Sequence, residues 1–137
     1  MNVSELIDAA LEARQMSYAP YSHFAVGAAL LTEDERVFKG CNVENAALSP
    51  TVCAERAAFF NAIAAGCRDF TAIAIVGGKA GEDINKAYTF PCGTCRQVMC
   101  EFCAGSFEII VAKSRDDYAV YTLKELLPHS FGPVDLD

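Results

Sequence analysis

The chain has 137 residues, of which 53% are hydrophobic, and its formal net charge is -7 at pH 7. The length fits one domain, residues 1–137, and the apolar content indicates additional buried surface at subunit interfaces. The negative charge argues against DNA or RNA as a partner. No uninterrupted apolar stretch is long enough to cross a bilayer, so we expect no membrane partner either.

The cysteine content bears on the cellular compartment. Seven cysteines are an odd number, so they cannot all form disulfides within one chain. Residues 1–5 lack the basic start and apolar centre of a signal peptide. We therefore expect a cytoplasmic protein, in which clustered cysteines are metal ligands or redox thiols.

Hydrophobic periodicity predicts helices that alternate with apolar strands, which is typical of a layered α/β or α+β domain. The first helix covers residues 3–17, begins at Asn2 and Glu5 as in a capping box, and ends before Pro20. The other predicted segments, in chain order, are strand 25–32, turn 33–35, strand 36–41, loop 42–52, helix 53–65, strand 71–76, polar connection 79–90, helix 93–103, strands 107–112 and 118–122, and helical turn 123–127.

Three cysteines and one glutamate form the most informative pattern. Cys53-Ala54-Glu55 opens one predicted helix, and Cys92-x-x-Cys95 opens another. If these helix N-termini converge, the three sulfurs bind one zinc ion and leave its fourth position open for water, as in a catalytic site. Helix N-termini also favour thiolate over thiol. A carboxylate beside such a water, here Glu55, can move protons.

Arg56 follows this glutamate directly. Three thiolates and Zn²⁺ still carry one net negative charge, which makes a bound water less acidic. We expect the Arg56 guanidinium to donate to the sulfurs and to offset part of that charge.

A second pair, Cys100-x-x-Cys103, offers a competing interpretation, because with Cys92 and Cys95 it could build a closed structural zinc site. If both pairs lie on one helix, however, Cys103 is roughly 12 Å from Cys95 at 1.5 Å per residue, which one zinc ion cannot span.

The remaining residues of chemical interest are expected to be structural. We expect the other four cysteines to be buried in apolar surroundings: Cys41, Cys67, Cys100 and Cys103. We expect a core position for Phe59 and Phe60, and a surface position for His23 and His129.

Beyond the zinc motifs, several segments resemble the small, homotetrameric cytidine deaminases. The matching residues are 21–24, 27–29, 40–46, 53–56, 91–98 and 125–128, in order and with compatible spacing. The zinc motifs alone indicate only the wider superfamily of zinc-dependent deaminases. Asn42-x-Glu44 and the segment of Phe24 narrow the resemblance to enzymes that act on free nucleosides.

The resemblance implies a three-layer α/β/α fold with a five-stranded mixed sheet. It also implies hydrolysis of cytidine and 2′-deoxycytidine to uridine and 2′-deoxyuridine, with release of ammonia, as part of pyrimidine salvage. The enzyme would be a homotetramer whose active sites are shared between subunits.

By position, the resemblance assigns Zn²⁺ to Cys53, Cys92 and Cys95, and proton transfer to Glu55. It assigns substrate binding to five further residues. Asn42 and Glu44 would bind the ribose 3′-hydroxyl, Phe24 would pack on the substrate, and the Ala54 N–H would bind the pyrimidine carbonyl. Phe131 would reach the active site of a neighbouring subunit.

Two positions depart from the family pattern. Ala25 stands where relatives usually have proline, so the start of that strand is expected to be looser. Leu48 replaces a tyrosine near the part of the site that subunits share, which leaves the substrate range open.

Other functions remain possible at this point. A deaminase of another aminopyrimidine nucleoside, such as blasticidin S, would use the same zinc chemistry, although Asn42 and Glu44 favour an ordinary sugar. A deaminase that edits RNA or DNA is disfavoured by the acidic charge. A noncatalytic zinc-binding or thiol-redox module is disfavoured by Glu55, for which a structural site has no use.

Overall fold

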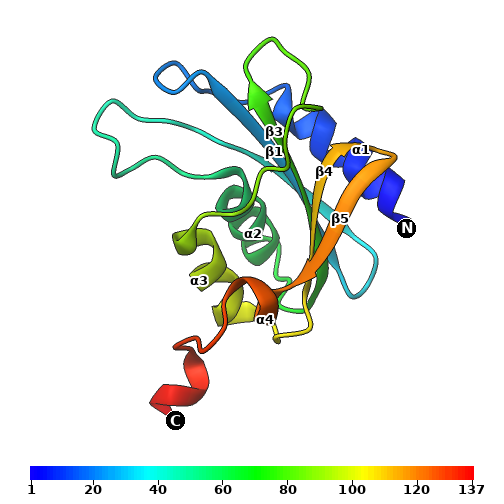
Figure 1. The fold of residues 1–137 in the computed structure, drawn as a ribbon. Coiled ribbons are helices and arrows are strands. Elements are labelled where there is room, and N and C mark those ends of the chain that lie inside the picture. The colour runs from blue at the N-terminus through cyan, green and yellow to red at the C-terminus, as the bar shows by residue number, and fades with distance from the viewer.

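Helices and strands alternate along the chain in the computed structural model, which describes residues 1–137 (Figure 1). The elements are α1 (Val3–Arg14), β1 (Phe24–Thr32), β2 (Val37–Cys41), α2 (Ala54–Ala64), β3 (Phe70–Lys79), α3 (Gly93–Phe102), β4 (Glu108–Ser114), β5 (Asp117–Thr122), α4 (Leu123–Leu126) and the 3-10 helix η1 (Pro133–Leu136).

The five strands form one mixed sheet in the order β2-β1-β3-β4-β5. β3 and β4 run parallel, and every other neighbouring pair runs antiparallel. Parallel neighbours need a crossover connection, because the chain must return to the same end of the sheet. Here the crossover contains α3, so the topology itself brings this helix onto one face of the sheet.

The helices cover both faces of the sheet (Figure 1). α1 packs on one face through a core that includes Leu6, Ile7 and Ala10. α2 and α3 pack on the other face, where Phe59 and Met99 are buried. The expected three-layer α/β/α arrangement with a five-stranded mixed sheet is therefore confirmed.

Glycine lets α2 lie directly against the edge of the sheet. A Cβ atom on Gly40 of β2 would lie 2.3 Å from the Ala54 carbonyl oxygen and 2.4 Å from the Ala58 nitrogen. No side chain fits in this space, so the first turns of α2 rest on the backbone of β2. This contact fixes the helix whose N-terminus carries Cys53.

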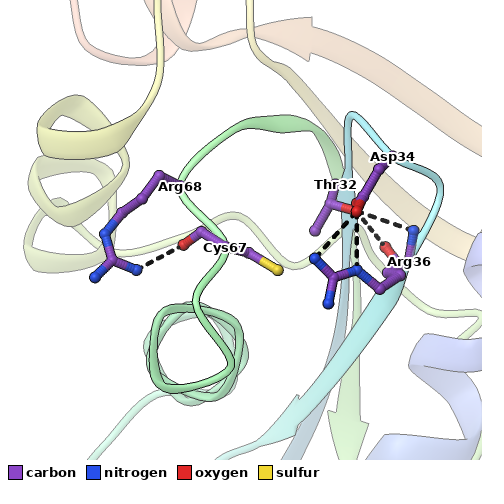
Figure 2. Close-up of polar contacts among 5 residues, drawn as sticks. All are labelled: Thr32, Asp34, Arg36, Cys67 and Arg68. Carbon is purple, nitrogen blue, oxygen red and sulfur yellow. Dashed lines mark hydrogen bonds and ion pairs between the residues drawn. The ribbon is translucent and has the colours of Figure 1, made fainter.

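The turn between β1 and β2 is held by its own side chains (Figure 2). The Arg36 backbone N–H donates to Thr32 Oγ1 at 2.9 Å, and Arg36 Nε donates to Asp34 Oδ2 at 3.1 Å. The same view shows Cys67 and Arg68 just after α2, where Arg68 Nη1 donates to the Cys67 carbonyl oxygen at 2.9 Å.

Several expectations about individual segments were wrong. The first helix ends at Arg14, because Tyr18 instead forms a bridge with Val43. β3 continues to Lys79, since its partner β1 extends the pairing as far as Phe24. The 3-10 helix near the C-terminus was not predicted.

Burial also differs from expectation at four side chains. Cys67 is buried as expected, whereas Cys41, Cys100 and Cys103 are only half-buried. Phe59 belongs to the core, but Phe60 is 48% exposed, because it lies on the face of α2 that points away from the sheet. Both histidines are exposed, as predicted.

None of the helices combines the length and the apolar character needed to cross a membrane.

Candidate active site and metal centre

Three cysteine sulfurs gather where α2 and α3 begin. The Sγ atoms of Cys53, Cys92 and Cys95 all lie within 4.8 Å of one another. Cys53 Sγ is 3.9 Å from Cys92 Sγ, which is 3.5 Å from Cys95 Sγ. Cys100 and Cys103 lie at the opposite end of α3, so the closed four-cysteine site considered above is not formed.

The dimensions of this cluster fit a zinc ion. Tetrahedral coordination with Zn–S bonds near 2.3 Å separates two sulfurs by about 3.8 Å. The two observed contacts, 3.9 and 3.5 Å, lie on either side of that value. An all-sulfur donor set suits zinc well, and with three protein ligands one tetrahedral position stays open.

Local sequence explains why the sulfurs converge. Cys53 and Cys92 are the N-cap residues of α2 and α3, and neither helix receives a side-chain hydrogen bond at its cap. Cys95 lies in the first turn of α3 and is buried. Two helix N-termini therefore point at one cluster, and their partial positive charge favours thiolates there.

The Arg56 guanidinium completes the surroundings of the sulfurs. Arg56 Nη2 donates to Cys53 Sγ at 3.3 Å, and its Nε is buried without a partner. A hydrogen bond from the Cys95 thiol and the nearby Arg56 charge lower the pKa of Cys53 to about 5. The hydrogen bond to Cys53 in turn raises the pKa of Arg56. The Cys53 sulfur is therefore prepared to bind a cation as a thiolate.

Glu55 lies in the first turn of α2, directly beside this cluster, and its side chain is only 4% exposed. Burial raises the pKa of Glu55 to about 7, and the negative charge of Cys53 acts in the same direction. A carboxyl group that titrates near neutral pH both accepts and donates a proton readily. It can therefore act as a base and then as an acid.

Asn42 is buried and links the strand that begins at Phe24 to the loop after β2. Its Oδ1 accepts from the Val26 N–H at 2.9 Å and from the Ser17 hydroxyl. Its Nδ2 donates to the Phe24 carbonyl oxygen at 2.8 Å. An asparagine amide carries two donor hydrogens, so one remains for a ligand.

Glu44 binds the segment before β1 in a similar way. Its carboxylate accepts from the N–H groups of Tyr21 and Ser22, at 3.1 and 3.0 Å, and from the Ser22 hydroxyl. These hydrogen bonds lower the pKa of Glu44, with the Ser22 hydroxyl contributing most. A carboxylate has about four acceptor positions, so one is left for a hydroxyl of a ligand.

A short backbone bridge joins the segment of Asn42 and Glu44 to the residue before Cys53. Val43 and Val52 exchange two backbone hydrogen bonds, at 2.9 and 3.0 Å. Val52 precedes Cys53, so the Asn42–Glu44 segment runs beside the start of α2.

The remaining predicted site residues occupy different environments. Phe24 opens β1 and is 40% exposed. Ala54 is the first, fully buried residue of α2, where backbone N–H groups have no partner within the helix. Phe131 is 61% exposed, in a tail that extends past α3 and away from the sheet (Figure 1). It does not join the sulfurs of its own chain.

Sizeable hollows lie elsewhere on the chain. One of about 500 Å³ is lined by Phe70, Phe102 and Phe107, near the far end of α3, and it includes none of the three clustered cysteines. The chemistry of the sulfur cluster therefore identifies the site better than cavity volume does.

Two residues that organise α3 were not predicted from the sequence. Arg96 donates to the backbone carbonyls of Pro91 and Leu126, and Gln97 Nε2 donates to the Phe131 carbonyl oxygen at 2.7 Å. Their position directly after Cys95 was the only available signal. Their partners are 30 or more residues away or in a loop, so spacing did not reveal them.

Comparison with known proteins gives consistent results. Residues 1–111 match the family model described as the cytidine and deoxycytidylate deaminase zinc-binding region. The cytidine deaminase of Sporosarcina psychrophila is 46% identical over 136 residues, which cover 99% of this chain and 96% of that protein. The cytidine deaminase of Halalkalibacterium halodurans is 42% identical over 137 residues, covering 100% and 99%.

Solved structures agree. The crystal structure of cytidine deaminase from Burkholderia pseudomallei superposes with a TM-score of 0.87 at 47% identity, covering 96% of this chain and 100% of that one. The enzyme from Mycobacterium tuberculosis gives a TM-score of 0.82 at 36% identity, covering 96% and 98%.

Proposed function

Because the chain belongs to the family of zinc-dependent cytidine and deoxycytidylate deaminases, we propose that it hydrolyses cytidine to uridine and ammonia. 2′-Deoxycytidine is the second expected substrate, and pyrimidine salvage is the expected role. The observation that carries this proposal is the cluster of three sulfurs within 4.8 Å of one another, beside the buried carboxyl group of Glu55.

The zinc ion is assigned to Cys53, Cys92 and Cys95. When bound, it supplies an acidified water that acts as the nucleophile at C4 of the pyrimidine. Arg56 donates to the Cys53 sulfur and so draws off part of the negative charge of three thiolates. Replacing it with alanine should lower zinc content or turnover, and an Arg56→Ala protein unchanged in both would refute this role.

Glu55 moves the protons. Its carboxylate accepts one proton from the attacking water and delivers it to ring N3, which makes C4 electrophilic. It then carries the second proton to the exocyclic nitrogen, which leaves as ammonia. Both protons come from the same water, so one carboxyl group suffices. A pKa of about 7 supports this dual role near neutral pH.

Substrate contacts are assigned to residues around this centre. The free Nδ2 hydrogen of Asn42 and the free acceptor position of Glu44 suit a ribose 3′-hydroxyl, which both donates and accepts. The exposed ring of Phe24 packs on the substrate, and the Ala54 N–H binds the pyrimidine carbonyl.

We further propose a homotetramer in which Phe131 of one chain reaches the site of a neighbour. Several large apolar side chains support an additional interface, since they are exposed on the single chain: Leu48, Phe60, Phe131, Val134 and Leu136. Leu48 also has a φ of 63°, which is unfavourable for leucine and is more easily understood if a neighbouring subunit holds the loop. All seven cysteines are free thiols, which supports a cytoplasmic location.

The direct test is incubation of the purified protein with cytidine, following the change in ultraviolet absorbance as the amino group is lost. Ammonia release should match uridine formation. Blasticidin S and single-stranded DNA serve as alternative substrates in parallel assays. Turnover of either in place of cytidine would contradict the proposed substrate class, and no turnover of any would favour a noncatalytic zinc module.

A further inference from the structure

Arg96 contacts the backbone on both sides of Cys92. Its Nε donates to the Pro91 carbonyl oxygen at 2.7 Å, and its backbone N–H donates to the Cys92 carbonyl oxygen at 3.0 Å. The two peptide carbonyls that flank Cys92 in the chain are therefore both bound by the same residue. Pro91 is buried, so its carbonyl has few alternative partners.

The other end of the guanidinium reaches a distant element. Arg96 Nη1 donates to the Leu126 carbonyl oxygen at 2.7 Å, at the end of α4. One side chain thus ties the loop before α3 to both α3 and α4. The loop is held from two directions, although the Cys92 side chain itself is exposed and makes no cap hydrogen bond.

We propose that Arg96 is a positioning residue for the zinc ligand Cys92. The guanidinium fixes the Pro91–Cys92 peptide, and this peptide sets where Cys92 Sγ lies relative to Cys53 and Cys95. This proposal rests on the assignment of zinc to these three sulfurs. It concerns a residue that touches neither substrate nor sulfur and acts only through the backbone.

Arginine is suited to this role by its shape. Its planar guanidinium presents several N–H donors in fixed directions, so it binds two carbonyls in different elements at once. Lysine keeps the charge but has a single flexible ammonium group. We therefore expect Arg96→Lys to retain the fold and to release one of the two carbonyls.

The expected effect is a loss of zinc affinity. Groups that orient metal ligands from outside the coordination shell typically contribute about 10–100-fold to affinity. Arg96→Lys should weaken zinc binding by about tenfold, and Arg96→Gln, which has a shorter side chain, by at least as much. A purely structural role would destabilise the zinc-bound and zinc-free protein equally and would leave the zinc affinity unchanged.

The chain offers a matched control in Arg68 (Figure 2). Arg68 Nη1 also donates to two backbone carbonyls, those of Ile63 and Cys67, at 3.0 and 2.9 Å. The Ile63 carbonyl lies in the last turn of α2 and the Cys67 carbonyl just after it, opposite the end that carries Cys53. Arg68→Lys therefore removes the same kind of contact without affecting a zinc ligand.

The experiment is competition for Zn²⁺ between a chromophoric chelator and the wild type, Arg96→Lys, Arg96→Gln or Arg68→Lys, with circular dichroism to verify folding. The proposal predicts a tenfold or greater rise in the zinc Kd for both Arg96 variants, and a Kd within twofold of wild type for Arg68→Lys.

Three results would overturn it: an unchanged Kd in the folded Arg96 variants, an equal loss in Arg68→Lys, or failure of both Arg96 variants to fold with zinc present. If the wild type binds zinc but does not deaminate cytidine, the proposed reaction is wrong, whereas the conclusion about Arg96 and zinc affinity still holds. Wild type that binds no zinc would refute both.

Discussion

Glu55 is the residue on which the proposed reaction depends most directly. Replacing it with glutamine keeps the size and polarity of the side chain in its buried position but removes the ability to carry a proton. General acid–base catalysis commonly contributes about 10²–10⁴-fold to a rate. Because both proton transfers would fail, we expect kcat of Glu55→Gln to fall by about 10⁴-fold or more, measured by the absorbance assay with cytidine.

The zinc content of the same variant is its internal control. Glu55 is not a ligand in this assignment, so Glu55→Gln should still bind about one zinc ion per chain. A zinc-loaded variant that turns over cytidine within tenfold of wild type would refute the proton-transfer role.

The cysteines allow a second prediction, because the chain contains both cluster and non-cluster thiols. Alanine at Cys53, Cys92 or Cys95 should abolish tight zinc binding, since each leaves only two sulfurs. Alanine at Cys100 or Cys103 should leave about one zinc ion per chain, as measured by atomic absorption. Zinc lost from Cys100→Ala but kept by Cys53→Ala would overturn the ligand assignment.

The position of helix α2 depends on its close contact with Gly40, so a substitution there tests whether this contact holds the start of α2 in place. Gly40→Ala inserts a methyl group where backbone atoms lie 2.3 and 2.4 Å away, so α2 must shift. Overpacking of this kind typically costs about 1–3 kcal/mol, and we expect such a loss in urea unfolding, together with weaker zinc binding.

Gly93→Ala provides the comparison for this variant. Nothing lies within 4 Å of a Cβ atom built on Gly93, and this glycine is the first residue of α3, whereas Gly40 lies in β2. Its unfolding free energy should be unchanged or higher, because alanine favours the helix. A loss of stability as large as that of Gly40→Ala would show that the contact with α2 is not the cause.

Local patterns predicted much of this arrangement. The apolar runs around Ala28 and Ile73 predicted β1 and β3, and the glycine after α2 marked its end. The motif spacing predicted the sulfur cluster, because each cysteine lies at or near the start of a helix and both helices needed only to converge. The resemblance to cytidine deaminases is also confirmed by the family match and the solved structures.

Contacts between distant segments were not predictable in this way. The bond from Arg96 to Leu126 spans 30 residues, and the end of the first helix was set by pairing of Tyr18 with Val43. Neither contact is signalled by a periodic pattern or by a characteristic residue spacing in the sequence. The same is true of Phe60, whose exposure depends on which face of α2 meets the sheet.

Assembly of subunits is the prediction that concerns the complete protein. Exposed apolar side chains such as Phe60 and Phe131 on the single chain lead us to expect a homotetramer. Sedimentation velocity of the purified protein should give a mass near four times 14.7 kDa. A monomer that retains full cytidine turnover at low concentration would exclude composite active sites.

The distribution of the sulfurs along the chain has a consequence for folding. Cys53 precedes the central strand β3 and Cys92 follows it, 39 residues later, so a metal ion bound to both sulfurs would close a loop that contains this strand. Closing a loop of this length in the unfolded chain costs conformational entropy worth about 4 kcal/mol by the relation used for disulfides. The folded chain has already closed this loop, so the ion binds the folded state more tightly than the unfolded state. A chelator should therefore lower the Tm of the wild type but not that of Cys53→Ala, as measured by calorimetry. In a reducing environment, where a disulfide would not persist, the ion would serve as the reversible cross-link of this fold.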